Sequence, residues 1–388
     1  MAQARQAPSV NREARTIWLE ATAKRAGFSG VPAFAQAFDL REYRLTQLYH
    51  AAAKELCASL GEVTTLPKTL RARMAERGVT LSSLEPATIQ RSRDGHTSKG
   101  LFRLGDGNDV EAVLMEHRQG RTTICISSQA GCAFACAFCS TGQAGFARNL
   151  SAVEIVDQAR YFAREARERG KRVTNVVFMG MGEPFHNYDA VMEAVALLND
   201  PQGFGLGHRH ITISTVGLVD RIDAFSREGI QVNLAISLHA PNDELRSSFM
   251  PVNRRHGVAE LMAACARYVE RTHRKVFFEY VMLAGINDSD VCARELAALM
   301  RGHLYHVNLI PYNATPDAPY AGSAEERIWS FAGILDEAGV PVTVRHNMGR
   351  DIAAACGQLR SETQPKAQRS GSKELSGAGP GQVKQAAP

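Results

Sequence analysis

The stretch "GCAFACAFCSTGQAGF", residues 131–146, carries three cysteines at positions 132, 136 and 139. A closed structural zinc site uses four ligands, commonly from two C-x₂-C pairs, and the second pair is missing here. An iron–sulfur cube takes four cysteine thiolates when the protein binds all of its irons. Cys132, Cys136 and Cys139 supply three from one loop, which leaves one iron free for a small molecule, with Phe138 as an apolar shield. A zinc site completed by a distant His or Cys stays open as an alternative.

The loop follows an apolar segment that begins a regular alternation. Short Val- and Ile-rich segments alternate with amphipathic stretches such as "SAVEIVDQARYFAREARER". Strands of this kind joined by helices predict a parallel α/β sheet. Without a GxGxxG motif, the pattern favours a partial (β/α)6 barrel, whose chemistry gathers at the carboxyl ends of the strands. The predicted strands are "TTICISS" (122–128), "VTNVVFMG" (173–180), "HITISTVG" (210–217), "QVNLAISLHA" (231–240), "VFFEYVML" (276–283), "YHVNLIPYN" (305–313) and "VPVTVRH" (340–346).

The segments on either side divide the chain into four parts. Residues 1–15 are polar and are expected to be disordered, and residues 16–95 are expected to form a helical, RNA-binding accessory domain. In it, Lys68, Arg71, Arg73 and Arg77 form a basic run that is either a solvated helix face or an RNA contact. The barrel and a terminal cysteine segment occupy residues 96–360. The tail, 361–388, is rich in Gly, Ser, Pro and Gln and is expected to be disordered.

Composition limits the class of protein. The 388 residues are 45% hydrophobic, which is enough for a large core, and the net charge of +5 permits an RNA partner. There is no long apolar run and no apolar segment at the N-terminus, so we expect a cytoplasmic protein without a membrane span. In a reducing compartment the eight cysteines are not a disulfide framework, and the clustered ones are candidates for metal binding or redox chemistry.

The CxxxCxxC motif with an aromatic before the last cysteine resembles the signature of the radical S-adenosylmethionine (SAM) superfamily. In that superfamily SAM chelates the free iron of a [4Fe–4S] cluster. Electron transfer then splits the sulfonium and produces a 5′-deoxyadenosyl radical. "FMGMGEP", residues 178–184, stands where the superfamily has a Gly-Gly-Glu-like motif at the end of the second strand. The resemblance implies that Gly182 and Glu183 hold the SAM amino group.

Three stretches narrow the resemblance: "CISSQAGCAFACAFCSTGQAGFARNL" (125–150), "GMGEPFHNY" (180–188) and "RDIAAACGQL" (350–359). Together they resemble the RlmN/Cfr family of radical SAM rRNA adenine methyltransferases, from about residue 35 to residue 360. By themselves Cys125, on a strand, and Cys356, in an Ala-rich turn, are ordinary packing residues. The ring carbons of adenine resist ordinary nucleophilic methyl transfer, so two thiols could deliver and then release a methyl group as a radical.

The resemblance implies a mechanism. Cys356 takes a methyl group from a first SAM, and a radical made from a second SAM abstracts hydrogen from that S-methyl group. The methylene radical adds to the adenine, and Glu111 accepts the ring proton. Cys125 then attacks the Cys356 sulfur, forming a transient disulfide and releasing methylated RNA, and a reductant regenerates both thiols. From its strand "DVEAVLM" alone, Glu111 is a surface residue.

The resemblance also assigns the other ligands and partners. It implies one [4Fe–4S] cluster on the three cysteines, two SAM molecules per turnover, and 23S rRNA as substrate, with tRNA as a further candidate. Flavodoxin or ferredoxin is the expected electron donor, and we expect a monomer. Polar residues at strand ends of a barrel face one pocket, which agrees with the implied SAM contacts. These contacts are Gly182, Glu183, Ser214, Ser237, Leu238, His239 and Asn313.

The position of the methyl group and the class of protein each have rival hypotheses. "CSTGQAGF" and "GMGEP" resemble RlmN-type members, which methylate carbon 2 of a 23S rRNA adenosine and often adenosine 37 of tRNAs. "VRHNMGRDI" (344–352) and "LYHVNLI" (304–310) resemble Cfr-type members, which methylate carbon 8 of the same rRNA adenosine. Carbon 2 is the prediction. A zinc-stabilised RNA-binding protein without catalysis, and a radical SAM activase acting on a protein glycine, are the rivals from other classes.

Overall fold

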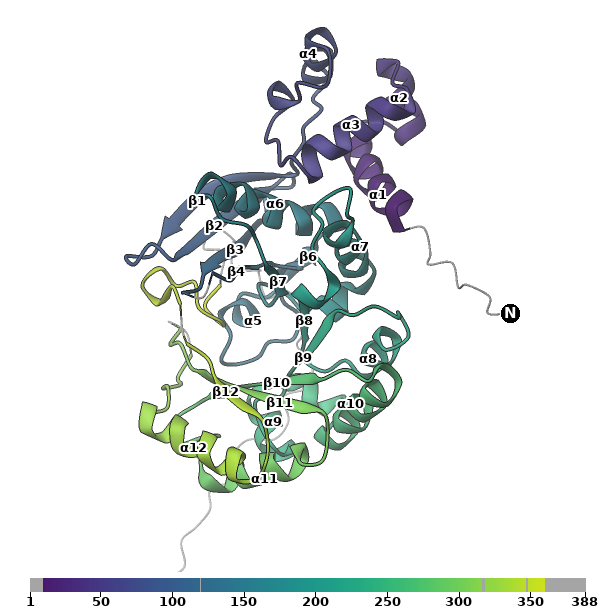
Figure 1. The fold of residues 1–388 in the computed structure, drawn as a ribbon. Helices are drawn as coiled ribbons and strands as arrows, with labels where there is room; N and C mark the ends of the chain where they lie inside the picture. The colour runs from purple at the N-terminus through teal and green to yellow at the C-terminus, as the bar shows by residue number, and fades with distance from the viewer. Residues whose placement is uncertain (1–9, 119, 316–317, 347, 360–388) are drawn as a thin grey trace, which may run out of the picture.

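The computed structural model describes residues 10–118, 120–315, 318–346 and 348–359. One ten-stranded sheet runs through these residues in the order β1-β2-β3-β4-β7-β8-β9-β10-β11-β12 (Figure 1). From β4 to β12 every neighbouring pair is parallel. These seven strands are β4 (Thr122–Cys125), β7 (Asn175–Phe178), β8 (Ile211–Thr215), β9 (Asn233–Ser237), β10 (Val276–Met282), β11 (Tyr305–Pro311) and β12 (Val342–Val344). Each lies within one of the seven predicted segments, so the α/β barrel class is confirmed.

Helices join the parallel strands and cover the outer face of the sheet (Figure 1). The sequence of α6 (Ala152–Glu168) shows why a helix forms directly after the cysteine loop. Ser151 caps the helix, and Glu154 returns a hydrogen bond to the Ser151 amide, while apolar residues recur on the buried face. The other connecting helices are α7 (Tyr188–Asn199), α8 (Val219–Phe225), α9 (Asp243–Phe249), α10 (Val258–Thr272), α11 (Asp290–Met300) and α12 (Glu325–Glu337).

Three antiparallel strands extend the sheet on the side of β4. They are β1 (Leu84–Arg91), β2 (Thr97–Leu104) and β3 (Asp109–Glu116). The predicted boundary at residues 95 and 96 is therefore wrong, because β1 was placed in the helical accessory domain. The reason is visible in its burial: only Leu84 of the eight residues of β1 is buried, so this edge strand lacks the apolar alternation that marks a strand.

The accessory domain consists of four helices, which lie beyond the β1 end of the molecule (Figure 1). They are α1 (Val10–Arg25), α2 (Val31–Phe38), α3 (Glu42–Ala53) and α4 (Lys68–Glu76). The expectation of disorder for residues 1–15 is wrong at residues 10–15, because Ala14 is fully buried and continues the apolar stripe of Trp18 and Leu19. Residues 1–9 and the tail at 361–388 lie outside the described residues.

Two buried polar contacts attach the accessory helices to the barrel. The Tyr49 hydroxyl donates a hydrogen bond to Asp200 at 2.7 Å. Arg160 of α6 donates to the backbone carbonyls of Ala52 and Leu81, each at 2.8 Å. The accessory helices therefore have a fixed position against α6. Within the described ranges, no helix is long and apolar enough to cross a membrane.

Candidate functional site

The three cysteines of the loop line one cavity of about 110 Å³. The loop leaves the short hairpin of β5 (Gln129–Gly131) and β6 (Phe146–Asn149) and turns back through α5 (Ser140–Ala144). Gly142 makes this return possible, since a Cβ there would lie 2.9 Å from the Cys136 amide nitrogen. Among the described residues no group of three His, Cys, Asp or Glu side chains is arranged to hold a single metal ion. The three cysteines do share the wall of one cavity.

The rest of the cavity wall comes from the carboxyl ends of neighbouring parallel strands. Gly180, Gly182 and Glu183 follow β7, Val216 follows β8, and Ser237 and His239 come from the end of β9. Phe138, Thr141, Gly142 and Met250 complete the lining. The predicted location, at the carboxyl ends of the barrel strands, matches this arrangement.

Glu183 is a buried carboxylic acid at the wall of this cavity. Its Oε1 accepts a hydrogen bond from the Phe185 amide at 2.9 Å and its Oε2 accepts one from the Val216 amide at 2.8 Å. Burial raises the pKa of Glu183 to about 7, outweighing the hydrogen bonds from Thr215, Val216 and Phe185 that lower it. Glu183 can therefore change between neutral acid and carboxylate near neutral pH.

His239 presents a neutral imidazole to the cavity. Its Nδ1 accepts a hydrogen bond from the Val281 amide at 3.0 Å, which leaves the proton on Nε2. Burial, followed by the charge of Arg246, lowers the pKa of His239 to about 3. The ring packs edge-on against Phe138 at 4.9 Å between centroids, and its backbone has a positive φ of 60°. The Nδ1 of His239 thus has a structural partner in Val281, while the ring lines the cavity with an Nε2 that can donate a hydrogen bond.

The structure brings most, but not all, of the predicted SAM contacts to this cavity. Gly182, Glu183, Ser237 and His239 line it. The Ser214 hydroxyl lies 3.4 Å from the Ser237 hydroxyl, so it is adjacent to the wall. Leu238 and Asn313 are buried and are not among the lining residues.

Arg246 of α9 is a buried arginine that the sequence did not point to. It is 1% exposed, and it donates to the carbonyls of Leu238 at 3.0 Å and Val216 at 2.6 Å. It therefore ties the ends of β8 and β9 together at the cavity wall. Burial lowers the pKa of Arg246 to about 10, and the nearby Cys136 thiol opposes this. The helical stretch "DELRSSF" gives no signal of this role, because the carbonyl partners are distant in the sequence.

The C-terminal segment that carries Cys356 is fastened to the cysteine loop. The Ser140 amide donates to the Gly357 carbonyl at 2.9 Å, and the Thr141 hydroxyl donates to the Leu359 carbonyl at 2.6 Å. On its other side the Asp351 carboxylate accepts a hydrogen bond from the Arg93 amide at 2.8 Å. Residues 350–359 are thus held between the cysteine loop and the β1–β2 hairpin, although they are more than 200 positions away from either.

Cys356 and Cys125 lie close enough for their charges to interact. Cys356 is exposed to solvent, while Cys125 at the end of β4 is buried, and both are free thiols. Burial raises the pKa of Cys125, and the charge of Cys356 raises it further. The pKa of Cys356 is also raised by the protein that surrounds it, and Arg345 opposes this shift. Solvent therefore reaches Cys356, although the residues around its thiol desolvate it in part.

Glu111 is not the surface residue that its strand pattern alone suggested. It is 4% exposed and forms an ion pair of 3.1 Å with Lys99 on the neighbouring strand β2. Lys99 also donates to the Ala353 carbonyl at 3.4 Å, in the segment that carries Cys356. The pairing was predictable in part, because the Asp-Gly dipeptide at 106–107 is typical of the hairpin turn that sets β2 against β3.

The basic run of the accessory domain lies on α4 and makes contacts within that domain. Arg73 donates to the Ala37 carbonyl at 3.2 Å, and Arg77 stacks over the Phe28 ring at 5.8 Å. Arg71 donates to the Gly61 carbonyl. Lys68 is exposed. The RNA-contact prediction for these four residues stays a prediction.

Comparisons with known proteins agree with this geometry. Residues 126–294 match the family model described as the radical SAM superfamily. A crystal structure of a radical SAM methyltransferase from Sphaerobacter thermophilus is 51% identical, with a TM-score of 0.82, and the match covers 86% of this chain and 97% of that one.

Curated relatives are similar over almost the same span. The probable dual-specificity RNA methyltransferase RlmN of Chloroflexus aurantiacus is 50% identical over 328 residues, which cover 82% of this chain and 86% of the relative. The ribosomal RNA large subunit methyltransferase N of Nitrosopumilus maritimus is 44% identical over 326 residues, covering 82% of this chain and 93% of the relative.

The fold and the three-cysteine cavity define a SAM-dependent radical enzyme. The chain belongs to the RlmN family of radical SAM RNA methyltransferases. Membership implies a [4Fe–4S] cluster and SAM, and the residues fit both groups. Three thiols, and no fourth among the described residues that line the cavity, face it together with a carboxylate and an imidazole donor.

Proposed function

We propose that this enzyme methylates carbon 2 of one adenosine in the peptidyl-transferase centre of 23S rRNA, and adenosine 37 of certain tRNAs. Relatives that carry the words "dual-specificity" and "ribosomal RNA large subunit" in their names support the two RNA substrates. The observation that carries the proposal is the attachment of the Cys356 segment to the cysteine loop through Ser140 and Thr141. This attachment holds a thiol from the end of the chain beside the site where a radical would form.

Three side chains have distinct roles in the proposed reaction. Cys356 carries the methyl group on its sulfur, and its solvent exposure lets an adenine reach it. Glu111 accepts the proton from the ring carbon, and Lys99 at 3.1 Å stabilises its carboxylate form until then. Cys125 then attacks the Cys356 sulfur and the sulfur–carbon bond breaks. The carbon leaves with the bonding electron pair and takes up a proton to become the methyl group, and an external reductant reopens the disulfide that remains.

The cavity would hold both cofactors. Cys132, Cys136 and Cys139 would bind the cluster, and when bound, the cluster and SAM supply one-electron chemistry and the methyl group. The SAM contacts would be Gly182, Glu183, Ser214, Ser237, Leu238, His239 and Asn313. In this arrangement the ionised Glu183 would attract the SAM ammonium group, while the His239 Nε2 proton would be available to an acceptor atom. We infer two SAM molecules per turnover.

The remaining partners belong to the same proposal. RNA would also contact the accessory helices, through Lys68, Arg71, Arg73 and Arg77, because phosphate contacts orient a nucleic acid without reading its bases. A flavodoxin or ferredoxin would supply electrons, and the enzyme would work as a monomer in the cytoplasm.

Nucleoside mass spectrometry tests the proposed position of methylation. The enzyme is expressed in a host that lacks its own adenosine methyltransferase of this family, and the 23S rRNA is digested and analysed. The expected product is 2-methyladenosine, absent from cells without the enzyme. If only 8-methyladenosine appears, the Cfr-type assignment replaces this one. If neither appears in rRNA or tRNA, the proposal is wrong.

The metal content tests the cofactor part separately. Anaerobically purified protein should be brown and should bleach on addition of dithionite, and replacing Cys136 with alanine should remove the colour. A colourless protein holding one zinc ion per chain would instead support the zinc-stabilised RNA-binding protein.

A further inference from the structure

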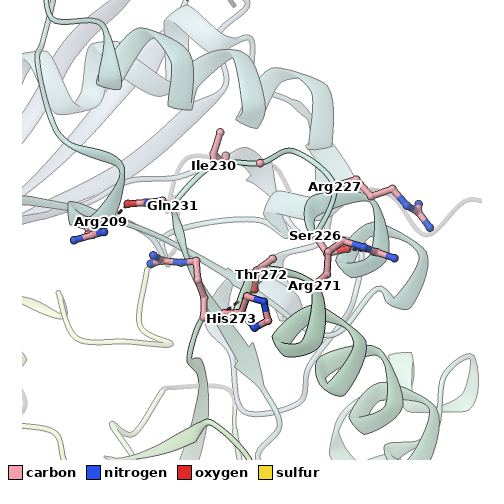
Figure 2. A pocket seen from close by; sticks show the side chains of 10 residues that line it. Arg209, Ser226, Arg227, Ile230, Gln231, Arg271, Thr272 and His273 are labelled. Carbon is pink, nitrogen blue, oxygen red and sulfur yellow. Dashed lines mark hydrogen bonds between the residues drawn. The ribbon is translucent and has the colours of Figure 1, made fainter. Parts of the chain in front are cut away.

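A second hollow lies at the opposite end of the parallel sheet from the cysteine cavity. Its volume is about 690 Å³. The lining comes from residues that precede β8, β9 and β10 and from the ends of α8 and α10, so it faces the amino ends of these strands. Figure 2 shows Arg209 with Gln231 on one side, and Arg227 with Ser226 and Arg271 on the other. The lining residues, which we call the arginine hollow, are Arg209, Ser226, Arg227, Gly229, Ile230, Gln231, Arg271, Thr272, His273 and Arg274.

The arginine hollow is strongly basic. Four of its ten lining residues are arginines, and none is an aspartate or a glutamate. Within the described part of the chain, none of these four arginines forms an ion pair. Among the acidic side chains that are close in sequence, Asp223 pairs with Arg267 at 2.7 Å and Glu228 accepts the Tyr188 hydroxyl at 2.8 Å. The charge of Asp223 also acts on Arg227 and Arg271, and Glu270 is exposed beside Arg271. The lining itself still carries four positive charges and no negative one.

Structural roles account for only part of this charge. Arg271 and His273 stand at the carboxyl end of α10, where cations offset the helix dipole. Arg209 and Arg227 come from other elements, and Arg209 uses only its Nε, donating to Gln231 at 2.8 Å. Arg274 donates a bond to Asn233 at 2.7 Å, it also bonds the Tyr268 hydroxyl, and its Nε is buried. Arg271 donates to the Ser226 hydroxyl. Since each guanidinium carries five N–H donors, the exposed Arg209 and Arg227 keep most of theirs available to a ligand.

We propose that the arginine hollow binds phosphates of the RNA backbone during methylation, an inference that rests on the proposed RNA substrate. Guanidinium groups match phosphate oxygens with paired, charge-assisted hydrogen bonds. Gln231 adds a neutral amide donor to the same surface, whereas the hydroxyls of Ser226 and Thr272 already donate to the Asp223 and Tyr268 carbonyls. No Phe, Tyr or Trp lines the hollow, so it offers no platform for stacking bases. It therefore contacts the backbone and contributes affinity without reading sequence.

The distance to the cysteine cavity suits one continuous RNA. Strand β8, five residues long, separates the two ends of the sheet, which is roughly 16 Å at the usual rise per residue. One strand of a nucleic acid helix advances about 3.4 Å per nucleotide, and the RNA has to pass around the helices that cover the sheet, so the phosphates at the hollow lie more than about five steps from the modified base. The hollow would thus bind RNA that flanks the target adenosine.

RNA binding as a function of salt tests the proposal. Arg209→Gln with Arg227→Gln removes one charge from each side of the hollow, and both side chains are exposed. Arg172→Gln with Arg294→Gln is the matched control, because these exposed arginines lie outside the hollow and form no ion pair among the described residues. The dissociation constant for a 23S rRNA fragment that contains the peptidyl-transferase loop is measured with each holoenzyme between about 50 and 200 mM KCl.

The hollow variant should lose about one to two units of the slope of log Kd against log salt, and the control should keep the wild-type slope. Over that range the wild-type protein would then lose about four- to sixteenfold more affinity than the hollow variant. Equal slopes in the hollow variant and the control overturn the proposal. Circular dichroism checks that each variant is folded. Arg227→Gln alone serves as the second variant, because the Arg227 side chain forms no hydrogen bond or ion pair among the described residues. Methylation of the same fragment by the wild-type enzyme is assayed separately. This assay distinguishes failure of the proposed phosphate binding by the arginine hollow from failure of the proposed rRNA substrate.

Discussion

The two ends of the parallel sheet are built in opposite ways. At the carboxyl ends, side chains are buried and hydrogen-bonded, and burial raises the pKa of Cys132 to about 12 and that of Glu183 to about 7. At the amino ends, exposed arginines surround a hollow without a carboxylate. The first end holds groups that must keep a fixed geometry and change charge during a reaction. The second end holds permanent charges, which suit a ligand that is bound by its own charge.

The two ends also differ in how far apart in the sequence their contributing elements are. Around the cysteine cavity, residues 350–359 form hydrogen bonds with the β1–β2 hairpin and with the cysteine loop, which are distant from them in sequence. The arginine hollow uses short connections between consecutive elements. Substitutions at the carboxyl ends should therefore disturb both stability and chemistry, whereas substitutions at the amino ends should change RNA affinity.

The largest expected effect is that of removing the Cys356 thiol. Cys356→Ala should reduce methylation of 23S rRNA by at least about a thousandfold, because the proposed mechanism places the methyl group on this sulfur. RNA affinity should remain close to that of the wild type. Cys292→Ala, which removes a buried thiol on α11, is the control and should retain activity. Full methylation by Cys356→Ala would contradict the role proposed for this thiol, and the activase hypothesis survives only if Cys356→Ala retains full activity.

Breaking the Lys99–Glu111 pair should destabilise the protein. Lys99→Met removes the cation that pairs with the buried Glu111 carboxylate, and breaking a buried ion pair typically costs about 3–5 kcal/mol in the free energy of unfolding. Urea denaturation measures this loss. The double variant Lys99→Met with Glu111→Gln removes both charges and should recover much of the stability. Equal losses in the single and double variants would show that the ion pair is not the cause.

Much of the fold was predictable, because apolar Val- and Ile-rich segments determine the seven parallel strands. The edge strand β1 was missed because seven of its eight side chains are exposed. The family resemblance pointed to Glu183 and His239, and both line the cavity, while their contacts with SAM stay a prediction. Arg246 was not, because its function depends on the carbonyls of Val216 and Leu238, which only the fold brings together.

The pKa of Glu183 predicts a pH dependence of SAM binding. The neutral acid predominates below pH 7 and the carboxylate above it, and only the carboxylate attracts the SAM ammonium. The affinity of the anaerobic holoenzyme for SAM should therefore rise about tenfold per pH unit from about pH 5 to pH 7 and then level off. Equilibrium binding across this range measures it. Glu183→Gln should bind SAM weakly and without this rise, and a wild-type affinity independent of pH would contradict the role.

The smallest expected effect concerns the attachment of the C-terminal segment. Thr141→Val removes the hydrogen bond to the Leu359 carbonyl and should cost about 1 kcal/mol of stability. It should also speed alkylation of Cys356 by a thiol reagent, because residues 350–359 lose one tether to the cysteine loop. Thr343→Val, at a hydroxyl that contacts His306 away from this segment, is the control. Unchanged alkylation rates would mean that the remaining contacts hold the segment without Thr141.

The most direct test of the central claim, that Cys356 carries the transferred carbon and Cys125 releases it, uses the Cys125→Ala enzyme. Purified from cells and analysed by mass spectrometry after nuclease and protease digestion, it should contain an adenosine joined to Cys356 through a thioether. Recovery of uncrosslinked, normally methylated RNA from this variant would contradict the account.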